Sequence, residues 1–299
     1  MIRIFGTVFA ALAGLVFGSF LNVCVTRWPE GESVVRPRSH CRNCDHVLAW
    51  WENIPLVSWV VLRGRCRACR EWIGWRYPIV EAAVGALWAV AAWRMTAPDR
   101  FPEPGPVFLY VAIARIVAEF VFCWLLVALA ALDAEHFWLP DRITLPGIVL
   151  GLGQAVVIGA LSAALPIIGG GGSMKYGAWR ELGGHAFASA SAAGFLLLVR
   201  WLYWLFRRRQ GLGLGDVKLM AMIAAWLGPR NAVLALVIAV LLGTLAALML
   251  LIASARRRES AAKWAATPLP FGTFLCVGGI VSSLWGAQMI SAYLHWAGF

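Results

Sequence analysis

Two aspartates stand at the ends of apolar runs, where a carboxylate is costly. Asp133 directly follows the stretch VFCWLLVALAAL, and Asp216 closes the sequence GLGLGD in front of another apolar run. An acid at membrane depth is a functional candidate by default, because burying its charge in hydrocarbon is unfavourable. Two carboxylates that share one proton can act as an aspartic-protease dyad, in which one takes a proton from water and the other protonates the scissile carbonyl.

Helix capping is the alternative role for such acids. Asp141 precedes an apolar run and is predicted to cap the helix that follows, and Asp216 also stands where a helix is expected to begin. Gly213 and Gly215 indicate more than a cap at Asp216, because glycine permits a close backbone approach that a cap does not require. We therefore predict a substrate loop made of Gly213, Gly215 and Lys218.

Four of the seven cysteines form two Cys-x-x-Cys pairs, a pattern typical of a zinc site. Cys41 pairs with Cys44 and Cys66 with Cys69, and 21 residues separate the two pairs. Four thiolates can surround a zinc ion tetrahedrally, and such a closed site is structural rather than catalytic. Disulfides do not persist in a reducing cytoplasm, so metal binding explains the pairs better. A redox pair is the remaining alternative.

The composition argues against an ordinary soluble domain. Of the 299 residues, 61% are hydrophobic and 14% are charged, with a mean hydropathy of +0.74, whereas soluble proteins carry about 25% charged residues. The 17 tryptophans fit a chain that meets membrane–water interfaces. The net charge of +11 comes from basic clusters beside apolar runs, as the positive-inside rule predicts, so we expect no nucleic-acid partner.

The apolar runs predict an all-α polytopic membrane protein with about eight transmembrane helices and a small zinc-binding insert. A transmembrane helix needs about 20 apolar residues, and the shortest of the expected spans begins at the second aspartate. The spans lie near residues 4–25, 79–96, 107–131, 143–165, 185–206, 217–228, 231–253 and 272–295. The glycine-rich segment 166–184 is expected to form a flexible outer loop.

Residues 27–78 form a sizeable polar insert that contains the four paired cysteines. We therefore predict three regions: a first transmembrane helix at 1–26, the insert at 27–78, and a transmembrane domain with both aspartates at 79–299. Most Lys and Arg residues fall on one side of the predicted spans. This bias predicts that the insert and the glycine–aspartate loop face the cytoplasm and that both termini lie outside.

Long motifs follow one another over almost the whole chain. They are GSFLNVCVTRWP (18–29), the cysteine pairs, NIPLVSWVVLRGRCRAC (53–69), RYPIVE (76–81), DAEHFWLPDRITLP (133–146), GLGDVKLMA (213–221) and PFGTFL (270–275). Together they resemble the type IV prepilin peptidase family, whose members belong to the Gly-x-Gly-Asp intramembrane aspartyl proteases. The resemblance implies that Asp133 and Asp216 are the catalytic pair. Thr273 stands where proline is common in the family, a departure expected to be harmless.

The resemblance also implies an enzyme of the bacterial inner (cytoplasmic) membrane whose active site faces the cytoplasm. Such an enzyme cleaves the leader of type IV prepilins or type II secretion pseudopilins and methylates the new N-terminus from S-adenosylmethionine. The insert is the region associated with methyltransfer, and S-adenosylmethionine, structural zinc, prepilin substrates and membrane lipid are the expected cofactors and partners. The S-adenosylmethionine-binding residues are unknown from the sequence, although Asn53, Arg76 and Glu81 are polar candidates that could equally be packing partners.

Three other functions fit parts of this pattern. A peptidase without methyltransfer would share every motif. An ion-coupled transporter would use the aspartates as a proton relay. Such a relay is expected to have its acids near the middle of the spans, whereas these aspartates stand at the ends. A metal-sensing scaffold would depend on the cysteines and leave the aspartates inert.

Overall fold

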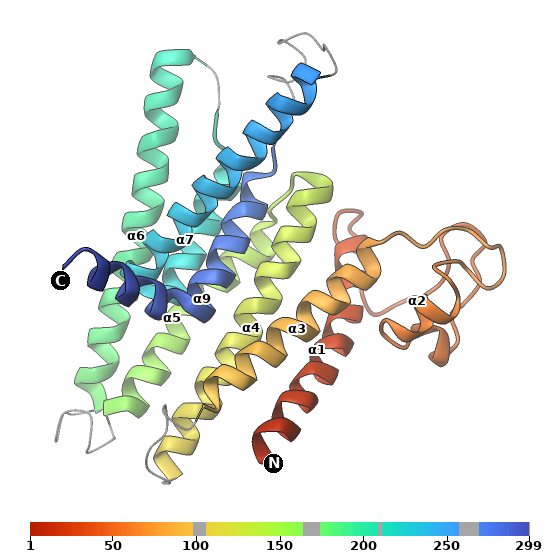
Figure 1. Ribbon diagram of the computed structural model, residues 1–299, viewed down its shortest axis with the longest axis horizontal. Helices are drawn as coiled ribbons and strands as arrows, with labels where there is room; N and C mark the ends of the chain where they lie inside the picture. The colour runs from red at the N-terminus through yellow and green to blue at the C-terminus, as the bar shows by residue number, and fades with distance from the viewer. Residues whose placement is uncertain (98–105, 164–173, 209–210, 257–268, 299) are drawn as a thin grey trace. The chain divides into compact units, whose positions relative to one another are not determined.

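A computed structural model describes residues 1–97, 106–163, 174–208, 211–256 and 269–298. Within these ranges the regular elements are helices (Figure 1). They are α1 (Ile2–Arg27), η1, a 3-10 helix (Trp50–Asn53), α2 (Val57–Val61), α3 (Arg76–Met95), α4 (Pro106–His136), α5 (Asp141–Ala163), α6 (Met174–Arg207), α7 (Leu214–Arg256) and α9 (Phe271–Trp296). Seven of these described helices are long and apolar enough to cross a membrane, which confirms the predicted fold class.

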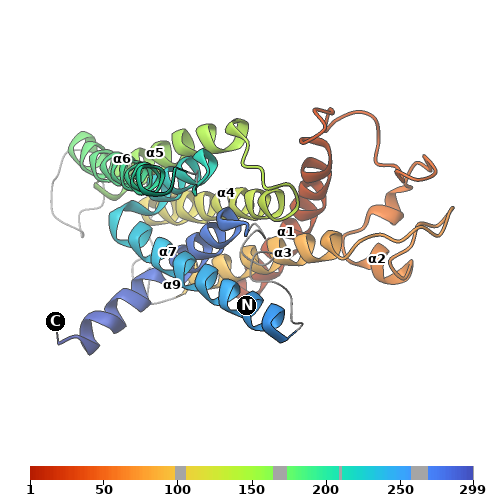
Figure 2. The same cartoon turned by 90° about the horizontal axis from the view of Figure 1, so that it is seen from above.

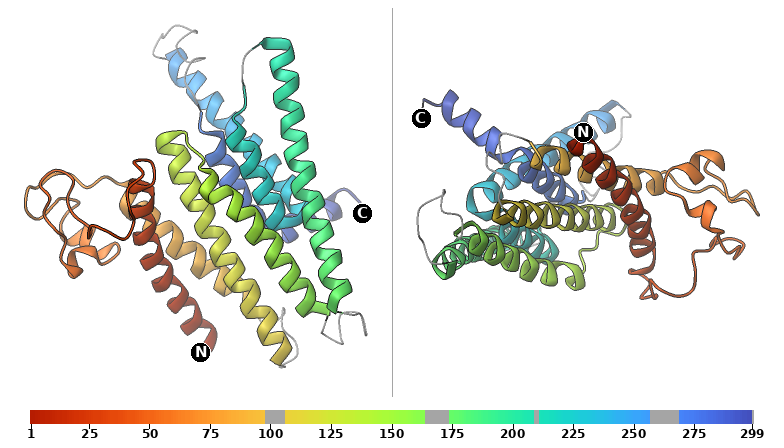
Figure 3. Two further views of the ribbon diagram at one scale, coloured as in Figure 1. Left: turned by 180° about the vertical axis from the view of Figure 1, so that it is seen from behind. Right: turned by 90° about the horizontal axis from the view of Figure 1, so that it is seen from below.

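The helices α1 and α3 lie side by side in the first of two structural units, which comprises residues 1–108 and 115–131 (Figure 3). Their backbones are in close contact, because a Cβ on Gly14 would lie 2.9 Å from the Cα of Gly85. Small residues allow such an approach between membrane helices, where lipid supplies no hydrophobic driving force for packing. The polar insert continues from these two helices as loops around η1 and α2.

The second unit comprises the described residues of 109–114 and 132–299. In it α5 packs beside α6, and α7 contacts α5, α6 and α9 (Figure 2). Side chains of α6 fix the first part of α7, since the Oγ of Ser189 donates a hydrogen bond of 2.9 Å to the carbonyl of Ala221. This unit contains both candidate aspartates.

The helix α7 is broken at Gly228, where the backbone has φ 70° and ψ 179° and where Pro229 follows. Proline cannot donate the backbone hydrogen bond that a continuous helix needs at this point. The predicted spans 217–228 and 231–253 are therefore the two arms of one broken helix. The first arm, residues 214–227, is only about 20 Å long at 1.5 Å per residue.

The second arm of α7 runs antiparallel to α9. Near its start, the carbonyl of Asn231 accepts a hydrogen bond of 2.7 Å from Ser282, near the middle of α9. Farther along, a Cβ on Gly243 would lie 3.5 Å from the ring of Phe274, at the beginning of α9. The second arm of α7 thus leads the chain back to the end of the unit at which α9 begins.

A Gly228→Ala variant is expected to lower the free energy of unfolding by about 1–3 kcal/mol, because its backbone conformation is essentially restricted to glycine. The added Cβ would also lie 3.4 Å from the Nε2 of His185. Thermal unfolding in detergent measures the loss. The matched control is Gly153→Ala on α5, where a Cβ meets nothing within 4 Å. Equal unfolding of the Gly228 variant and wild type would contradict a glycine-dependent break.

The helix α6 begins earlier than the span predicted at 185–206. Residues 166–173 of the predicted outer loop lie outside the described residues, but 174–184 are helical, so the loop prediction is wrong for this part. The reason is close packing on α5: a Cβ on Gly159 would lie 2.8 Å from the carbonyl oxygen of Gly177. Tertiary contact of this kind overrides the low helix propensity of glycine.

Candidate active site and metal centre

Asp133 lies near the C-terminal end of α4, and the beginning of α9 holds its carboxylate. The residue is 5% exposed, and its Oδ2 accepts hydrogen bonds from the backbone N–H of Thr273 at 2.7 Å and from its Oγ1 at 3.1 Å. This N–H belongs to the first turn of α9, whose donors have no partner inside the helix. Asp133 therefore caps α9 from another helix, where the positive end of the helix dipole favours a negative charge.

Asp216 lies in the first turn of α7 and is half-buried. Its Oδ2 accepts a hydrogen bond of 3.3 Å from the N–H of Gly213, so local capping is part of its geometry. Gly215, between them, packs tightly against another segment: a Cβ there would lie 3.0 Å from the Cβ of Leu139. The two glycines thus serve different purposes, one as a hydrogen-bond donor and the other as a close contact.

Leu139, in the turn between α4 and α5, links the surroundings of the two aspartates. Its side chain packs against both Gly215 and Gly272, leaving little room for a side chain on either glycine. A Cβ on Gly272 would also lie 2.9 Å from the Oδ2 of Asp133. The Oδ2 of Asp133, beside Gly272, and the backbone of Gly215, next to Asp216, therefore both lie close to Leu139. The end of α4 and the beginnings of α7 and α9 therefore converge, and they bring the two acids together.

Of the predicted substrate loop, Gly213 lies before α7, whereas Gly215 and Lys218 lie in the first turns of that helix, so the loop prediction is wrong for these two residues. Lys218 forms an ion pair with Asp141. Its Nζ lies 2.6 Å and 2.7 Å from the two carboxylate oxygens. Asp141 begins α5, so the pair connects α5 to α7 two residues beyond Asp216. Both side chains are partly exposed, and such a pair contributes only about 0–1 kcal/mol to stability.

The two cysteine pairs of the insert have the same local geometry. The N–H of Cys41 or Cys66 donates to the carbonyl five residues later, and its own carbonyl accepts from the N–H four residues later. Those fourth residues, Asp45 and Arg70, have positive φ of 56° and 61°. Each pair therefore sits in a tight knuckle that turns both sulfur atoms the same way.

The four sulfur atoms of these knuckles lie within 4.8 Å of one another. The Sγ atoms of Cys41 and Cys69 are 3.8 Å apart, and those of Cys44 and Cys66 are 4.0 Å apart. A tetrahedral zinc ion with Zn–S bonds of about 2.3 Å requires sulfur atoms about 3.8 Å apart. The cluster therefore fits zinc.

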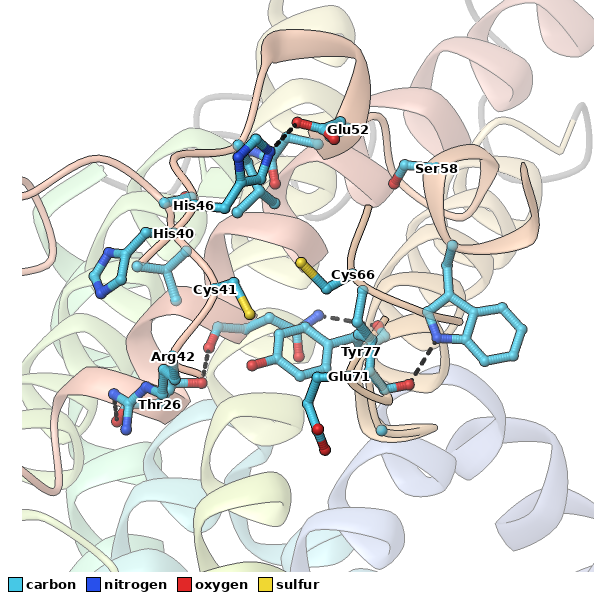
Figure 4. Close-up of a pocket in the computed structure, with 18 of the residues that line it drawn as sticks. Thr26, His40, Cys41, Arg42, His46, Glu52, Ser58, Cys66, Glu71 and Tyr77 are labelled. Carbon is cyan, nitrogen blue, oxygen red and sulfur yellow. Dashed lines mark hydrogen bonds and ion pairs between the residues drawn. The ribbon is translucent and has the colours of Figure 1, made fainter. Parts of the chain in front are cut away.

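A cavity of about 450 Å³ lies where α1 and α3 meet the insert (Figure 4). Two of the polar candidates for S-adenosylmethionine, Asn53 and Glu81, line it. The third, Arg76, contacts two other lining residues: it lies over the ring of Tyr77 and donates a hydrogen bond of 2.6 Å to the Oγ1 of Thr26. The candidates therefore gather around one hollow in the first unit.

Comparison with known proteins places the chain in a family. Residues 12–95 match the Bacterial Peptidase A24 N-terminal domain, and residues 120–248 match the Type IV leader peptidase family. The prepilin leader peptidase/N-methyltransferases of Stutzerimonas stutzeri and Pseudomonas aeruginosa are each 33% identical, over 96% of this chain and 93% of their own. The protein of that name from Myxococcus xanthus is 35% identical over 84% of this chain and 66% of its own length. The chain belongs to the type IV leader peptidase family. No solved structure matches it.

Family membership and the apolar helices together indicate a multi-pass protein of the inner membrane. The leader peptidase match contains both aspartates, and the N-terminal match contains the four paired cysteines. The predicted regions 1–26, 27–78 and 79–299 and the roles of the site residues stay predictions. Sequence reasoning missed Thr273 as the partner of Asp133, and the signal for it was its place in the family motif PFGTFL.

Proposed function

We propose that this member of the leader peptidase family cleaves prepilin leaders and methylates the N-terminus that cleavage creates. The observation that carries the peptidase activity is the convergence of Asp133 and Asp216 around Leu139 and Gly272. Methyltransfer is supported by the name that the similar proteins share. The substrates are type IV prepilins or type II secretion pseudopilins, cut at the cytoplasmic face of the inner membrane.

Cleavage uses the two acids as a general base and a general acid. The ionised carboxylate takes a proton from water while the water oxygen attacks the scissile carbonyl carbon, and the protonated carboxyl gives its proton to the carbonyl oxygen. When the tetrahedral intermediate collapses, the C–N bond breaks and the departing amine takes up a proton from the pair. Because one proton is shared, the pair titrates as a unit rather than as two separate acids.

The loop before α7 is the proposed place for the substrate backbone. Gly213 is exposed in front of α7 and Gly215 packs on Leu139 in its first turn, so no side chain covers the backbone at these two positions beside Asp216. An extended substrate segment lying there would expose its scissile carbonyl, which helical hydrogen bonding otherwise covers. In this arrangement the ion pair of Lys218 with Asp141 connects the first turns of α7 to the beginning of α5.

Thr273 is proposed to position Asp133, because its two hydrogen bonds hold one carboxylate oxygen in place. A Thr273→Val variant keeps the backbone bond and loses the hydroxyl bond. Hydrogen bonds to charged groups contribute about 1.5–3 kcal/mol, so kcat for leader cleavage is expected to fall by about tenfold, with KM little changed. Thr273→Ser should restore kcat. Cleavage by Thr273→Val at the wild-type rate would show that the hydroxyl positions nothing.

Zinc and S-adenosylmethionine are the proposed cofactors. The four cysteines supply a donor set that fits zinc and would hold the two knuckles of the insert together. When bound, S-adenosylmethionine would supply the methyl group that the new N-terminal amine accepts. The residues of the first unit then have to bind the cofactor and keep it apart from bulk water.

The test is to incubate the purified full-length protein with a prepilin and methyl-labelled S-adenosylmethionine and to analyse the pilin by mass spectrometry. The expected product lacks the leader and carries one labelled methyl group on its N-terminus. Leader removal without the label would show that the protein is a peptidase without methyltransferase activity. Proton-coupled uptake in liposomes with no cleavage would instead favour the transporter, although the structure places both acids at helix ends.

A further inference from the structure

The cavity in the first unit has the size of a small-molecule site. Its volume of about 450 Å³ lies within the roughly 300–1,000 Å³ that is usual for ligand pockets. Its walls come from the C-terminal part of α1, the beginning of α3 and both cysteine knuckles. Figure 4 shows Cys41 and Cys66 together with Thr26 and Tyr77 around it.

Glu52 lines this cavity and has a buried carboxylate oxygen without a partner among the described residues. One carboxylate oxygen, Oε2, accepts the N–H of Ala49 at 2.8 Å and lies 3.1 Å from the Nε2 of His46. The other, Oε1, is buried without a hydrogen-bond partner among the described residues. The hydrogen bond from Ala49 lowers the pKa of Glu52 below its usual range, so the carboxylate is ionised at neutral pH. A buried charged acceptor therefore lacks a donor.

Asn22 presents a second acceptor of the same kind. Its Nδ2 donates a hydrogen bond of 2.9 Å to the carbonyl of Tyr77, which orients the amide. Its Oδ1 is buried and has no partner in the described part of the chain. Burying an acceptor without a donor costs about 1–3 kcal/mol, and native proteins leave few such groups unexplained. Two such acceptors on residues that line one cavity indicate a ligand that brings hydrogen-bond donors.

The other residues that line the cavity indicate which chemical groups this ligand carries. Glu81, a third carboxylate, accepts the N–H of Leu56 at 2.8 Å, and the rings of Trp59 and Tyr77 supply aromatic surface. Carboxylates and aromatic faces both attract cations, and aromatic faces also stack on a flat heterocycle. Arg67, also among the lining residues, can pair with a carboxylate.

We propose that this cavity binds S-adenosylmethionine and that the free oxygens of Glu52 and Asn22 accept hydrogen bonds from its N–H and O–H groups. The cofactor combines an ammonium and a sulfonium cation, a carboxylate, ribose hydroxyls and an adenine ring, and the lining offers a counterpart to each. This assignment rests on the proposed methyltransfer. It also assigns a structural role to the zinc cluster, because the two knuckles that zinc would hold together form one wall of the cavity.

The experiment measures binding directly, by isothermal titration calorimetry of the zinc-loaded, full-length protein in detergent with S-adenosylmethionine. A Glu52→Gln variant keeps one oxygen for Ala49 and replaces the free oxygen with an amide NH₂, which repels the donors of the cofactor. Its Kd is expected to rise at least about tenfold. Ser58→Phe, which fills part of the cavity from α2, is expected to weaken binding similarly. Neither variant should change the rate of leader cleavage.

Glu181→Gln on α6 is the matched control, because it makes the same chemical change outside the lining residues and should bind as wild type does. Should Glu52→Gln lose its zinc or unfold, Ser58→Phe decides the question. Wild-type affinity in both cavity variants would overturn the assignment of the cavity while leaving methyltransfer intact. A wild-type protein that neither binds the cofactor nor methylates pilin would overturn the proposed methyltransfer, and the cavity assignment with it.

Discussion

Replacing Asp133 or Asp216 with asparagine is expected to lower the rate of leader cleavage by roughly 10³-fold, within the range typical of general acid–base groups. Asparagine keeps the size of the side chain and can still accept the bonds from Thr273 or Gly213. It cannot take a proton from water or give one to the carbonyl, so the chemistry is lost while the fold remains. The measurement is cleavage of a purified prepilin in detergent or liposomes, followed by gel shift and mass spectrometry.

Glu135→Gln is the matched control for this loss. Glu135 lies on α4 two residues beyond Asp133, but its side chain is partly exposed, so the variant is expected to cleave at close to the wild-type rate. Methylation of a synthetic mature pilin should also persist in both aspartate variants, because the proposed cofactor cavity lies in the first unit. Near-normal cleavage by either aspartate variant would contradict the proposed mechanism, because that mechanism requires both a general acid and a general base.

The second large effect is expected from Cys66→Ser, which should release the zinc from the insert. Wild type is expected to carry one zinc ion per chain by elemental analysis and the variant close to none. Structural zinc contributes about 10–16 kcal/mol to small metal-dependent folds, and the insert lacks a large apolar core of its own. Its loops should therefore become sensitive to protease, and cofactor binding should be lost along with the cavity wall.

Cys24→Ala serves as the control for the cysteine prediction, because Cys24 is buried in α1 and lies outside the cluster. It should keep its zinc. Removing the metal with a chelator should reproduce the Cys66→Ser result in wild type, and adding zinc back should reverse it. A full zinc content in Cys66→Ser would exclude the four-cysteine site.

The residues that carry chemistry were predictable from the sequence where their types contrast with their surroundings. Asp133 and Asp216 are conspicuous as acids beside apolar runs, and the cysteine pairs are conspicuous by their spacing. The break at Gly228 was also foreseeable as the boundary between two apolar runs, because glycine followed by proline interrupts a helix. What one sequence lacks is the pairing of distant segments.

The contact between Asp133 and Thr273 illustrates this limit, since it joins residues 140 positions apart. The motif PFGTFL singles out Thr273 as part of a functional segment, but nothing in that motif identifies Asp133 as its partner. The same holds for Glu52 and Asn22, which resemble ordinary polar residues until the fold buries one oxygen of each. The helical start of α6 was missed for a related reason, because its glycines indicate a loop until α5 is placed against them.

The most direct test of the central claim is the cleavage rate of the double variant Asp133→Asn/Asp216→Asn beside the two single variants. If the acids act as one pair, either substitution removes the function of both, so the double variant should be no slower than the slower single variant. Losses that multiply in the double variant would mean that the two acids act independently, and that result would contradict the shared-proton dyad.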